Sequence, residues 1–237
     1  MEATKPNLME TLDLRKKKIL DLTKSVGLEG QKAQVVLVMD YSGSMSELYK
    51  GGVVQELVER VLPLGLTFDD NKEIDMYLFH DGVIELKETV KRHNIDGYVN
   101  KAISGKSMGA TSYAPFIKSI LKKYGKKKLF GLGNYDTLEY PAYVIVITDG
   151  SNDDQGDAKK AMIEASNAGI FFQFIGIGRS SFPFLEKLDT MDGRFIDNAN
   201  FFPVQDVKSM SDDDLYACLF KEFPQYVKEA RTKNLIK

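Results

Sequence analysis

Oxygen-bearing side chains follow one another directly after an apolar run near residue 40 of this 237-residue chain. Residues 35–39 read VVLVM, and Asp40, Ser42 and Ser44 then stand at alternate positions. An apolar run of this kind is typical of a buried strand, so Asp40 is expected where that strand leaves the core. A helical pattern begins within a few residues, and the turn between a strand and a helix is where α/β sheets hold ligands.

The side chains in this turn favour one class of ligand, a hard divalent cation. Mg²⁺, Mn²⁺ and Ca²⁺ prefer carboxylate and hydroxyl oxygens, whereas Zn²⁺ asks for Cys or His, which residues 35–45 lack. The single cysteine, Cys218, also excludes an internal disulfide and a cysteine-based metal cluster. We therefore expect Mg²⁺ first, with Mn²⁺ or Ca²⁺ as the alternatives.

Two further polar positions lie at the ends of predicted elements far along the chain. Thr111 lies in a glycine-rich loop, residues 105–115, and stands just before a helical pattern. Asp149, followed by Gly150, comes directly after the apolar run 143–148, so an acidic residue again coincides with the end of a buried strand. Taken singly, each of these residues could instead serve as a helix cap or a turn former.

Strands and helices alternate from residue 33 onward, which is typical of an α/β fold. The apolar spacing between 54 and 62 predicts a buried helix that Pro63 closes. Strands 74–79 and 83–86 flank an Asp-Gly pair that favours a tight hairpin, so the second is expected as an antiparallel edge strand. The predicted fold is a doubly wound, mostly parallel central sheet with helices on both faces. The other expected elements are helices near 95–103, 117–124, 158–165, 182–188 and 215–227, the last kinked or restarted at Pro224, strands at 143–148, 170–177 and 194–203, and a surface loop over 122–128 and 131–140.

Residues 1–31 are predicted to form an amphipathic helical arm that precedes a domain spanning residues 32–237. Leu12, Ile19 and Leu22 share one helical face, while the basic residues 15–18 lie on and around the other. Two interpretations stay open: a helix docked on the domain, or a helix that binds a partner or an anionic surface.

The overall charge gives no indication of a nucleic-acid partner. Thirty-two basic and thirty-four acidic residues leave a formal net charge of −2. The amino terminus lacks the basic and apolar regions of a secretion signal, and no apolar run approaches the roughly 20 residues that span a bilayer. These features predict a cytoplasmic protein without a membrane span, and they leave its oligomeric state open.

Taken together, the three motifs resemble the metal-ion-dependent adhesion site (MIDAS) of von Willebrand factor type A (vWA) domains. The resemblance extends in order over nearly the whole chain from Ala33, and it departs at Ala110, where the family often has a second glycine. The leader LDLRKKKILDL and the compact size look similar to the intracellular TerF-like branch, which is associated with tellurium resistance. The resemblance implies a Rossmann-like fold and a metal site made of these side chains: Asp40, Ser42, Ser44, Thr111 and Asp149.

The resemblance further implies a non-enzymatic protein-interaction domain in a bacterial stress-response or tellurium-resistance system. The cation in such a site keeps an open position, which an Asp or Glu carboxylate of a protein partner completes. Residues that flank the site on the same rim of the sheet are expected to form the surface that recognises this partner: Tyr41, Met45, Met108, Tyr113 and Asn152.

An enzyme of the haloacid-dehalogenase type is the alternative function. In this class of Mg²⁺-dependent phosphohydrolase a strand-end aspartate, here Asp40, attacks phosphate. Its general acid is a second aspartate two residues further on, where this chain has Ser42. Because a serine cannot replace that proton donor at neutral pH, the sequence favours the interaction domain.

One more acidic cluster, Asp153, Asp154 and Asp157, precedes the predicted helix 158–165. A second ion site is one interpretation of it. The preferred interpretation is that these carboxylates interact favourably with the positive end of the helix dipole.

Overall fold

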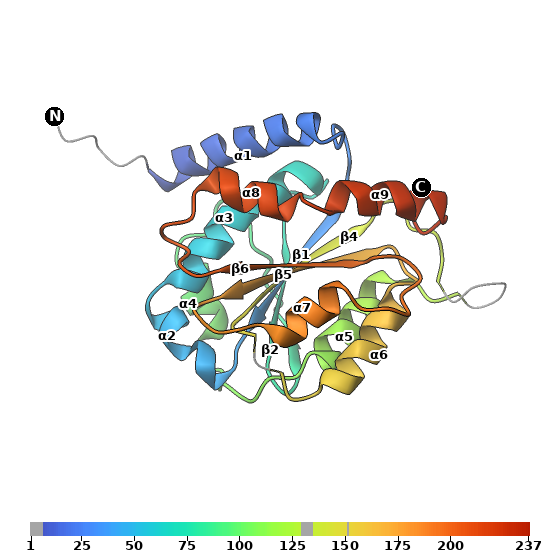
Figure 1. The fold of residues 1–237 in the computed structure, drawn as a ribbon. Coiled ribbons are helices and arrows are strands. Elements are labelled where there is room, and N and C mark those ends of the chain that lie inside the picture. The colour runs from blue at the N-terminus through green and yellow to red at the C-terminus, as the bar shows by residue number, and fades with distance from the viewer. Residues whose placement is uncertain (1–6, 129–134, 151) are drawn as a thin grey trace.

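The computed structural model describes residues 7–128, 135–150 and 152–237 (Figure 1). The first six residues of the predicted arm, and residues 131–134 of the predicted surface loop, lie outside the described residues. None of the described helices combines the length and the apolar character that crossing a membrane requires.

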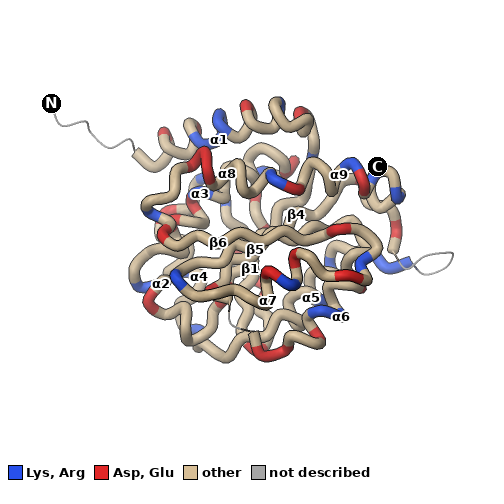
Figure 2. The backbone as a smooth tube through the Cα atoms, in the orientation of Figure 1, with Lys and Arg blue, Asp and Glu red and all other residues tan. Residues whose placement is uncertain are grey.

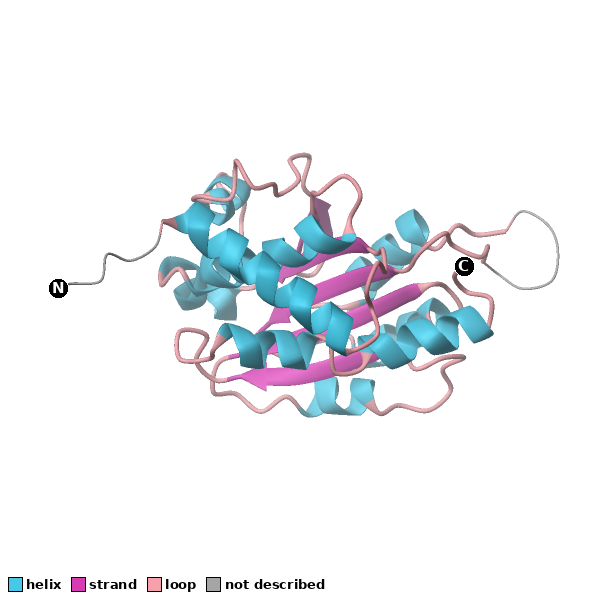
Figure 3. Cartoon of the chain, turned by 90° about the horizontal axis from the view of Figure 1, so that it is seen from above, coloured by secondary structure: helices cyan, strands magenta, loops and turns pink. Residues whose placement is uncertain are grey.

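A six-stranded sheet forms the centre of the fold (Figures 1 and 3). Its strands are β1 (Gln34–Asp40), β2 (Asp75–Phe79), β3 (Val83–Glu85), β4 (Ala142–Thr148), β5 (Ile170–Ile177) and β6 (Ala199–Val204). They lie in the order β3-β2-β1-β4-β5-β6, and every neighbouring pair is parallel except β2 with β3. The predicted mostly parallel sheet with one antiparallel edge strand is therefore confirmed.

Helices cover both faces of this sheet. They are α1 (Leu8–Ser25), α2 (Ser46–Lys50), α3 (Val53–Phe68), α4 (Tyr98–Ile103), α5 (Ala114–Tyr124), α6 (Gln155–Ala165), α7 (Pro183–Asp189), α8 (Asp212–Leu219) and α9 (Phe223–Thr232), with a short 3-10 helix, η1 (Gly43–Met45). Val35 and Leu37 of β1 face an apolar core shared with α1, α3, α8 and α9, whereas Val36 and Val38 face one shared with α5, α6 and α7 (Figure 1). Both faces are buried, which explains the continuous apolar run.

The register of the two central strands brings the acidic strand ends to one edge. Met39 of β1 is paired with Ile147 of β4, so Asp40 and Thr148 end their strands side by side. Because the two strands are parallel, the loops that follow them leave the sheet at the same carboxyl edge. Residues more than one hundred positions apart in the sequence therefore meet there.

Two prolines that the sequence marks as helix breakers behave differently. The prediction that Pro63 ends its helix is wrong, since α3 continues through it to Phe68. A proline inside a helix costs about 3 kcal/mol, but Leu64, Leu66 and Phe68 are buried beyond it, and burial of each such side chain contributes about 1.5–3 kcal/mol. Pro224 instead lies in the first turn of α9, where a new helix starts after α8, as predicted.

The helix α1 is docked on the domain. Leu12 and Ile19 are fully buried in the core, and two basic residues on the neighbouring face bind the start of α8. Arg15 Nε lies 2.9 Å from Asp212 Oδ2 and Lys18 Nζ lies 2.7 Å from Asp213 Oδ1, and Figure 2 shows basic and acidic residues side by side there. Of the two interpretations of this segment, the structure supports the docked helix for residues 8–25.

Candidate metal centre

Asp40 is the buried centre of a hydrogen-bonded cluster at the carboxyl edge of the sheet. Its side chain is fully buried, and both carboxylate oxygens are engaged. Oδ1 accepts the backbone N–H of Ser42 at 2.9 Å, and Oδ2 accepts the hydroxyl of Thr148 at 2.7 Å. The two bonds fix the orientation of the carboxylate in relation to both β1 and β4.

Thr148 is a residue of the site that the sequence analysis missed. Besides its bond to Asp40, its Oγ1 lies 3.0 Å from the hydroxyl of Tyr113 and accepts the N–H of Gly150 at 3.1 Å. Since the single proton of Thr148 goes to Asp40, Tyr113 is the donor in the second contact. A chain of hydrogen bonds therefore joins Tyr113, Thr148 and Asp40 in the interior.

The two serines of the first loop bring their hydroxyls together. Ser42 Oγ lies 3.1 Å from Ser44 Oγ, and the first is buried while the second is exposed. Ser42 occupies the N-cap position of η1 but makes no capping hydrogen bond with its side chain. The structural alternative of a helix cap therefore does not describe Ser42.

Backbone hydrogen bonds join the glycine-rich loop, residues 105–113, to the loop that follows β1. Ser42 and Gly109 form an isolated parallel bridge, in which Gly43 N donates to Gly109 O at 3.1 Å and Gly109 N donates to Tyr41 O at 3.3 Å. A Cβ atom at position 109 would lie 2.5 Å from Oδ1 of Asp81 and 3.1 Å from Cβ of His80, so a glycine fits this close approach without displacing either neighbour. The loop that carries Thr111 is thereby held against the loop that carries the serines.

Asp154 holds the loop that follows β4 against the loop that carries Thr111. Its Oδ1 accepts Tyr113 N and its Oδ2 accepts Ala114 N, both at 2.8 Å, so it caps the amino terminus of α5 from another part of the chain. Asp153 N also donates to the carbonyl of Thr111 at 2.8 Å. The preferred interpretation placed the Asp154 carboxylate at the dipole of the following helix, and the structure corrects it: this carboxylate serves α5, and it makes no capping bond to α6.

Asp149 and Asn152 present polar atoms that the described part of the chain leaves unsatisfied. Asp149 Oδ1 and Asn152 Nδ2 are both buried, and neither has a hydrogen-bond partner among the described residues. A buried carboxylate oxygen without a donor costs about 1–3 kcal/mol or more, so such an atom calls for an explanation. A bound cation next to Asp149 is one.

The charges around Asp40 also favour a bound cation. Burial, and to a smaller extent the nearby charge of Asp149, raise the pKa of the Asp40 carboxyl group to about 6, against the lowering effect of the hydrogen bonds from Thr148 and Ser42. No salt bridge involves Asp40 or Asp149 within the described residues. A divalent cation between two such carboxylates would replace repulsion with attraction.

The donor set fits a hard divalent cation. Within the described ranges there is no group of three or more His, Cys, Asp or Glu side chains that could hold a metal ion. Any ion at this edge must therefore rely on two carboxylates with hydroxyl groups, which are the ligands that Mg²⁺, Mn²⁺ and Ca²⁺ prefer. That Thr111 and Asp149 act as ligands, together with Asp40, Ser42 and Ser44, stays a prediction.

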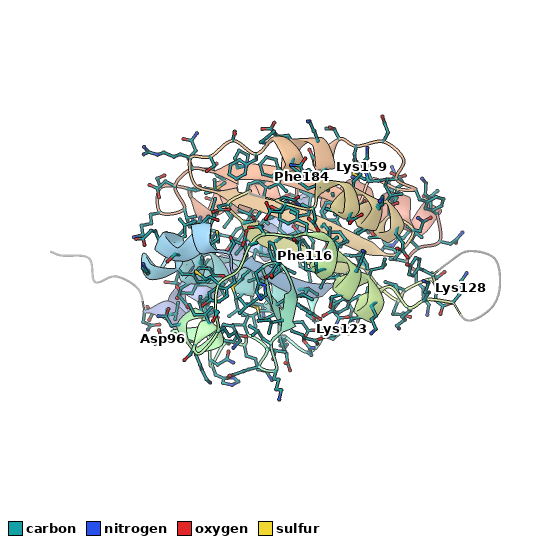
Figure 4. The ribbon with its side chains drawn as sticks, turned by 90° about the horizontal axis from the view of Figure 1, so that it is seen from below. Asp96, Phe116, Lys123, Lys128, Lys159 and Phe184 are labelled. Carbon is teal, nitrogen blue, oxygen red and sulfur yellow. The ribbon has the colours of Figure 1, made fainter. Side chains whose placement is uncertain are left out.

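Three of the five residues expected to recognise a partner are not on the surface. Met45 and Tyr113 are 0% exposed and Tyr41 is 6% exposed, so the prediction that they form the rim is wrong for them. Tyr113 packs on Phe116 of α5 and Phe184 of α7, which Figure 4 labels. Tyr41 Oη donates to Lys106 O at 3.1 Å. The tight turn directs these large side chains back into the core. Met108 and Asn152 are partly exposed and stay candidates.

Comparison with protein families identifies the fold. A family model described as "vWA found in TerF C terminus" matches residues 32–236. The chain belongs to this TerF-like family of vWA domains. The vWA match takes in the six strands described above and the whole candidate metal centre, and it leaves α1 outside its bounds.

One relative matches almost the full chain. The uncharacterized protein YcbR of Bacillus subtilis (strain 168) is 38% identical over 236 residues, which is 97% of this chain and 91% of YcbR. The alignment therefore includes the helix that precedes the vWA domain.

Solved structures of more distant proteins share the fold. A von Willebrand factor type A protein from Catenulispora acidiphila has a TM-score of 0.54 at 14% identity over 86% of this chain and 43% of its own. Proximal thread matrix protein 1 from the mussel byssus, solved with a zinc-occupied MIDAS motif, has a TM-score of 0.54 at 17% identity over 79% of this chain and 48% of its own. This chain thus spans less than half the length of either protein.

Proposed function

We propose that this vWA domain is a non-enzymatic docking module that binds an acidic group of a partner protein through a divalent cation. The ion would be held by Asp40, Ser42, Ser44, Thr111 and Asp149. The observation that carries the proposal is the pair of neighbouring carboxylates at one sheet edge, Asp40 and Asp149, which have hydroxyl groups around them and no cation from the described residues.

The charge balance of this set favours a further carboxylate from outside. Two aspartates neutralise a divalent cation, and the serine and threonine hydroxyls add oxygen atoms without adding charge. The bound ion therefore supplies Lewis acidity at an open position, where an Asp or Glu side chain of the partner would bind. The protein's own residues supply the fixed geometry, because Asp40 is held by Thr148 and the loops are joined through Gly109 and Asp154.

Mg²⁺ is the proposed ion, with Mn²⁺ and Ca²⁺ as alternatives. The mussel protein was solved with zinc in its MIDAS motif, so zinc belongs in any metal series tested on this chain. The absence of Cys and His from the first loop favours the harder ions here.

The proposed biological setting is a cytoplasmic bacterial stress-response or tellurium-resistance system, in line with the TerF-like family. The net charge of −2, with basic and acidic residues interspersed along the described chain, favours a protein partner over a nucleic acid (Figure 2).

The side chain at position 42 disfavours the phosphohydrolase. That reaction needs a general acid two residues after the aspartate nucleophile, and a serine cannot supply that proton at neutral pH. Ser42, which stands where the general acid would be, lies against Ser44.

Metal binding is tested by thermal unfolding and titration calorimetry after EDTA treatment. Mg²⁺, Mn²⁺, Ca²⁺ and Zn²⁺ are added separately to the wild type, to Asp40→Asn, and to the exposed control Asp70→Asn. A ligand at 100 times its Kd stabilises the fold by about 2.7 kcal/mol. We expect this gain for the wild type and the control and none for Asp40→Asn. An equal gain in all three proteins would contradict the proposal.

A further inference from the structure

The strand β3 has a free hydrogen-bonding edge. It pairs with β2 through contacts such as Leu86 N to Met76 O and His80 N to Gly82 O, and it is the outermost strand of the sheet. Because backbone groups in an antiparallel pair point toward and away from the partner by turns, those of Val83 and Glu85 point away from β2. They are available to another strand.

A groove lies beside this edge, between β3 and α4. Its volume is about 380 Å³, which is in the range of side-chain and small-ligand sites. The floor is apolar and the rim is charged. The lining residues are Ile84, Leu86, Tyr98 and Ala102 on the floor, and Glu85, Lys87, Glu88, Lys101 and Lys106 around it.

The free charge of this groove is positive. Glu85 binds Lys123 at 2.6 Å and Glu88 binds Lys101 at 2.9 Å, so both acidic residues are neutralised. In the described part of the chain, the ammonium groups of Lys87 and Lys106 form no ion pair. An occupant of this groove would therefore carry acidic side chains.

One loop connects the groove to the candidate metal centre, because Lys106 lines the groove and Gly109 lies beside Ser42. The carbonyl of Lys106 accepts the hydroxyl of Tyr41, and three residues further on Gly109 is bridged to Ser42. Along the sheet, Asp40 is paired with Phe79 and Phe79 with Val83. A strand added outside β3 would lie three strand spacings, about 14 Å, from β1, a distance that about four extended residues cover.

We propose that the groove between β3 and α4 binds an extended acidic segment of the partner, added to β3 as a further strand. This inference rests on the proposed function, because the same partner would bind the metal ion through a carboxylate about four residues away from the added strand. Backbone hydrogen bonds to Val83 and Glu85 provide affinity, and Lys87 and Lys106 select acidic side chains.

Synthetic peptides test this surface. The probes are twelve-residue peptides in which valine alternates with glutamate over five positions, with one aspartate placed two to six residues from that stretch. A second set replaces glutamate with lysine, and a third lacks the separate aspartate. Binding is followed by hydrogen exchange at the backbone amides of Val83 and Glu85, with Mg²⁺ or with EDTA.

Two variant pairs separate the backbone and charge contributions. Glu85→Pro removes an N–H that faces away from β2, and Glu85→Ala loses the same side-chain ion pair but keeps the N–H. Lys87→Glu with Lys106→Glu reverses the free charge. Lys159→Glu on α6, on the opposite side of the view in Figure 4 from Lys123, is the control for a charge reversal away from the groove.

Acidic peptides are expected to slow exchange at both amides, with basic peptides inactive. Glu85→Pro should weaken binding about three- to tenfold relative to Glu85→Ala, and the double lysine variant should weaken it at least as much, while Lys159→Glu has no effect. The peptides without the separate aspartate should protect the amides equally with Mg²⁺ and EDTA.

The results of these experiments distinguish the groove proposal from the metal-binding proposal. If Mg²⁺ stabilises the chain but no acidic peptide slows exchange at these amides at about 1 mM, the groove proposal is overturned and the metal proposal stands. If the peptides protect the amides while Mg²⁺ has no effect on stability, the groove stands and the metal proposal fails. Equal protection by basic peptides would overturn the acidic chemistry of the segment.

Discussion

Asp40 and Asp212 are both carboxylates that the fold shields from water, Asp40 completely and Asp212 with 21% of its side chain exposed, but their surroundings are opposite. Asp212 accepts hydrogen bonds from Arg60 Nε at 2.7 Å and Arg15 Nε at 2.9 Å, so two cations face one anion. Asp40 has hydroxyl and amide donors and a second carboxylate, Asp149, nearby. Burial of a charge is tolerated where it is paired, so Asp212 is a structural centre, whereas the unpaired Asp40 is consistent with the proposed cation site.

The Asp212 cluster holds three helices together. Arg60 of α3 is 3% exposed and also donates to the carbonyls of Val207 and Met210 at 2.8 Å, while Arg15 extends the cluster to α1. Arg60 Nε, both of its Nη atoms and Arg15 Nε each have an acceptor. The Asp40 cluster likewise joins three loops through hydrogen bonds. It leaves Asp149 Oδ1, however, without a donor among the described residues.

Arg60→Ala should have the largest effect on stability. It would leave Asp212 with only Arg15 and would orphan two carbonyls, and removal of one partner of a buried ion pair costs about 3–5 kcal/mol. The free energy of unfolding in urea measures this. A loss below about 1 kcal/mol would mean that the cluster behaves as a surface ion pair and that the contrast with Asp40 is false.

The same Asp→Asn change should act in opposite directions at the two centres. In EDTA, Asp40→Asn should raise the free energy of unfolding by roughly 1–3 kcal/mol, because burial raises the pKa of Asp40 to about 6 and its ionised form is disfavoured in the fold. Asp212→Asn should lower it, because Arg60 loses its counter-charge. Urea unfolding of both variants at neutral pH is the measurement, and a loss of stability in Asp40→Asn comparable to that in Asp212→Asn would break the comparison.

Thr148→Val should lower stability by about 1–3 kcal/mol. The change keeps the shape of the side chain but removes the donor to Asp40 and the acceptor for Gly150 N. It should also weaken the stabilisation by Mg²⁺, since Asp40 is no longer held. Thr67→Val on α3, which loses only a bond to the carbonyl of Pro63, is a matched control that should keep the full Mg²⁺ response.

Lys18→Ala should have the smallest effect. Its ion pair with Asp213 lies at the surface, with side chains 45% and 74% exposed, and exposed pairs contribute about 0–1 kcal/mol. Addition of 1 M NaCl should abolish even that difference between wild type and variant. A loss as large as that of Arg60→Ala would show that charge alone, without burial, sets the strength of the α1 contacts.

The centre of the sheet could be predicted from the sequence because β1 and β4 contain continuous apolar runs and an acidic residue, Asp40 or Asp149, marks the end of each. The roles of Thr148 and Asp154 could not, because they depend on which strand lies next to β1 and on how two loops meet. Thr148 reaches Asp40 only through the pairing of β1 with β4. No local pattern around either residue contains that register.

The residues of the surface expected to recognise a partner were predicted poorly for a related reason. Tyr41, Met45 and Tyr113 were expected at the surface because they neighbour polar site residues in the sequence. In a tight turn at a sheet edge, however, successive side chains point to different sides, and the large apolar ones return to the core. Pro63 is a similar case, in which tertiary burial overrides a local rule.

A crystal of this protein soaked in Mn²⁺ after EDTA treatment would test the central claim most directly, by its anomalous difference map. We expect one strong peak at the carboxyl edge, with oxygen atoms of Asp40 or Asp149, Ser42, Ser44 and Thr111 at about 2.0–2.3 Å or through one water. A well-occupied manganese peak elsewhere on the chain, with none between Asp40 and Asp149, would contradict it.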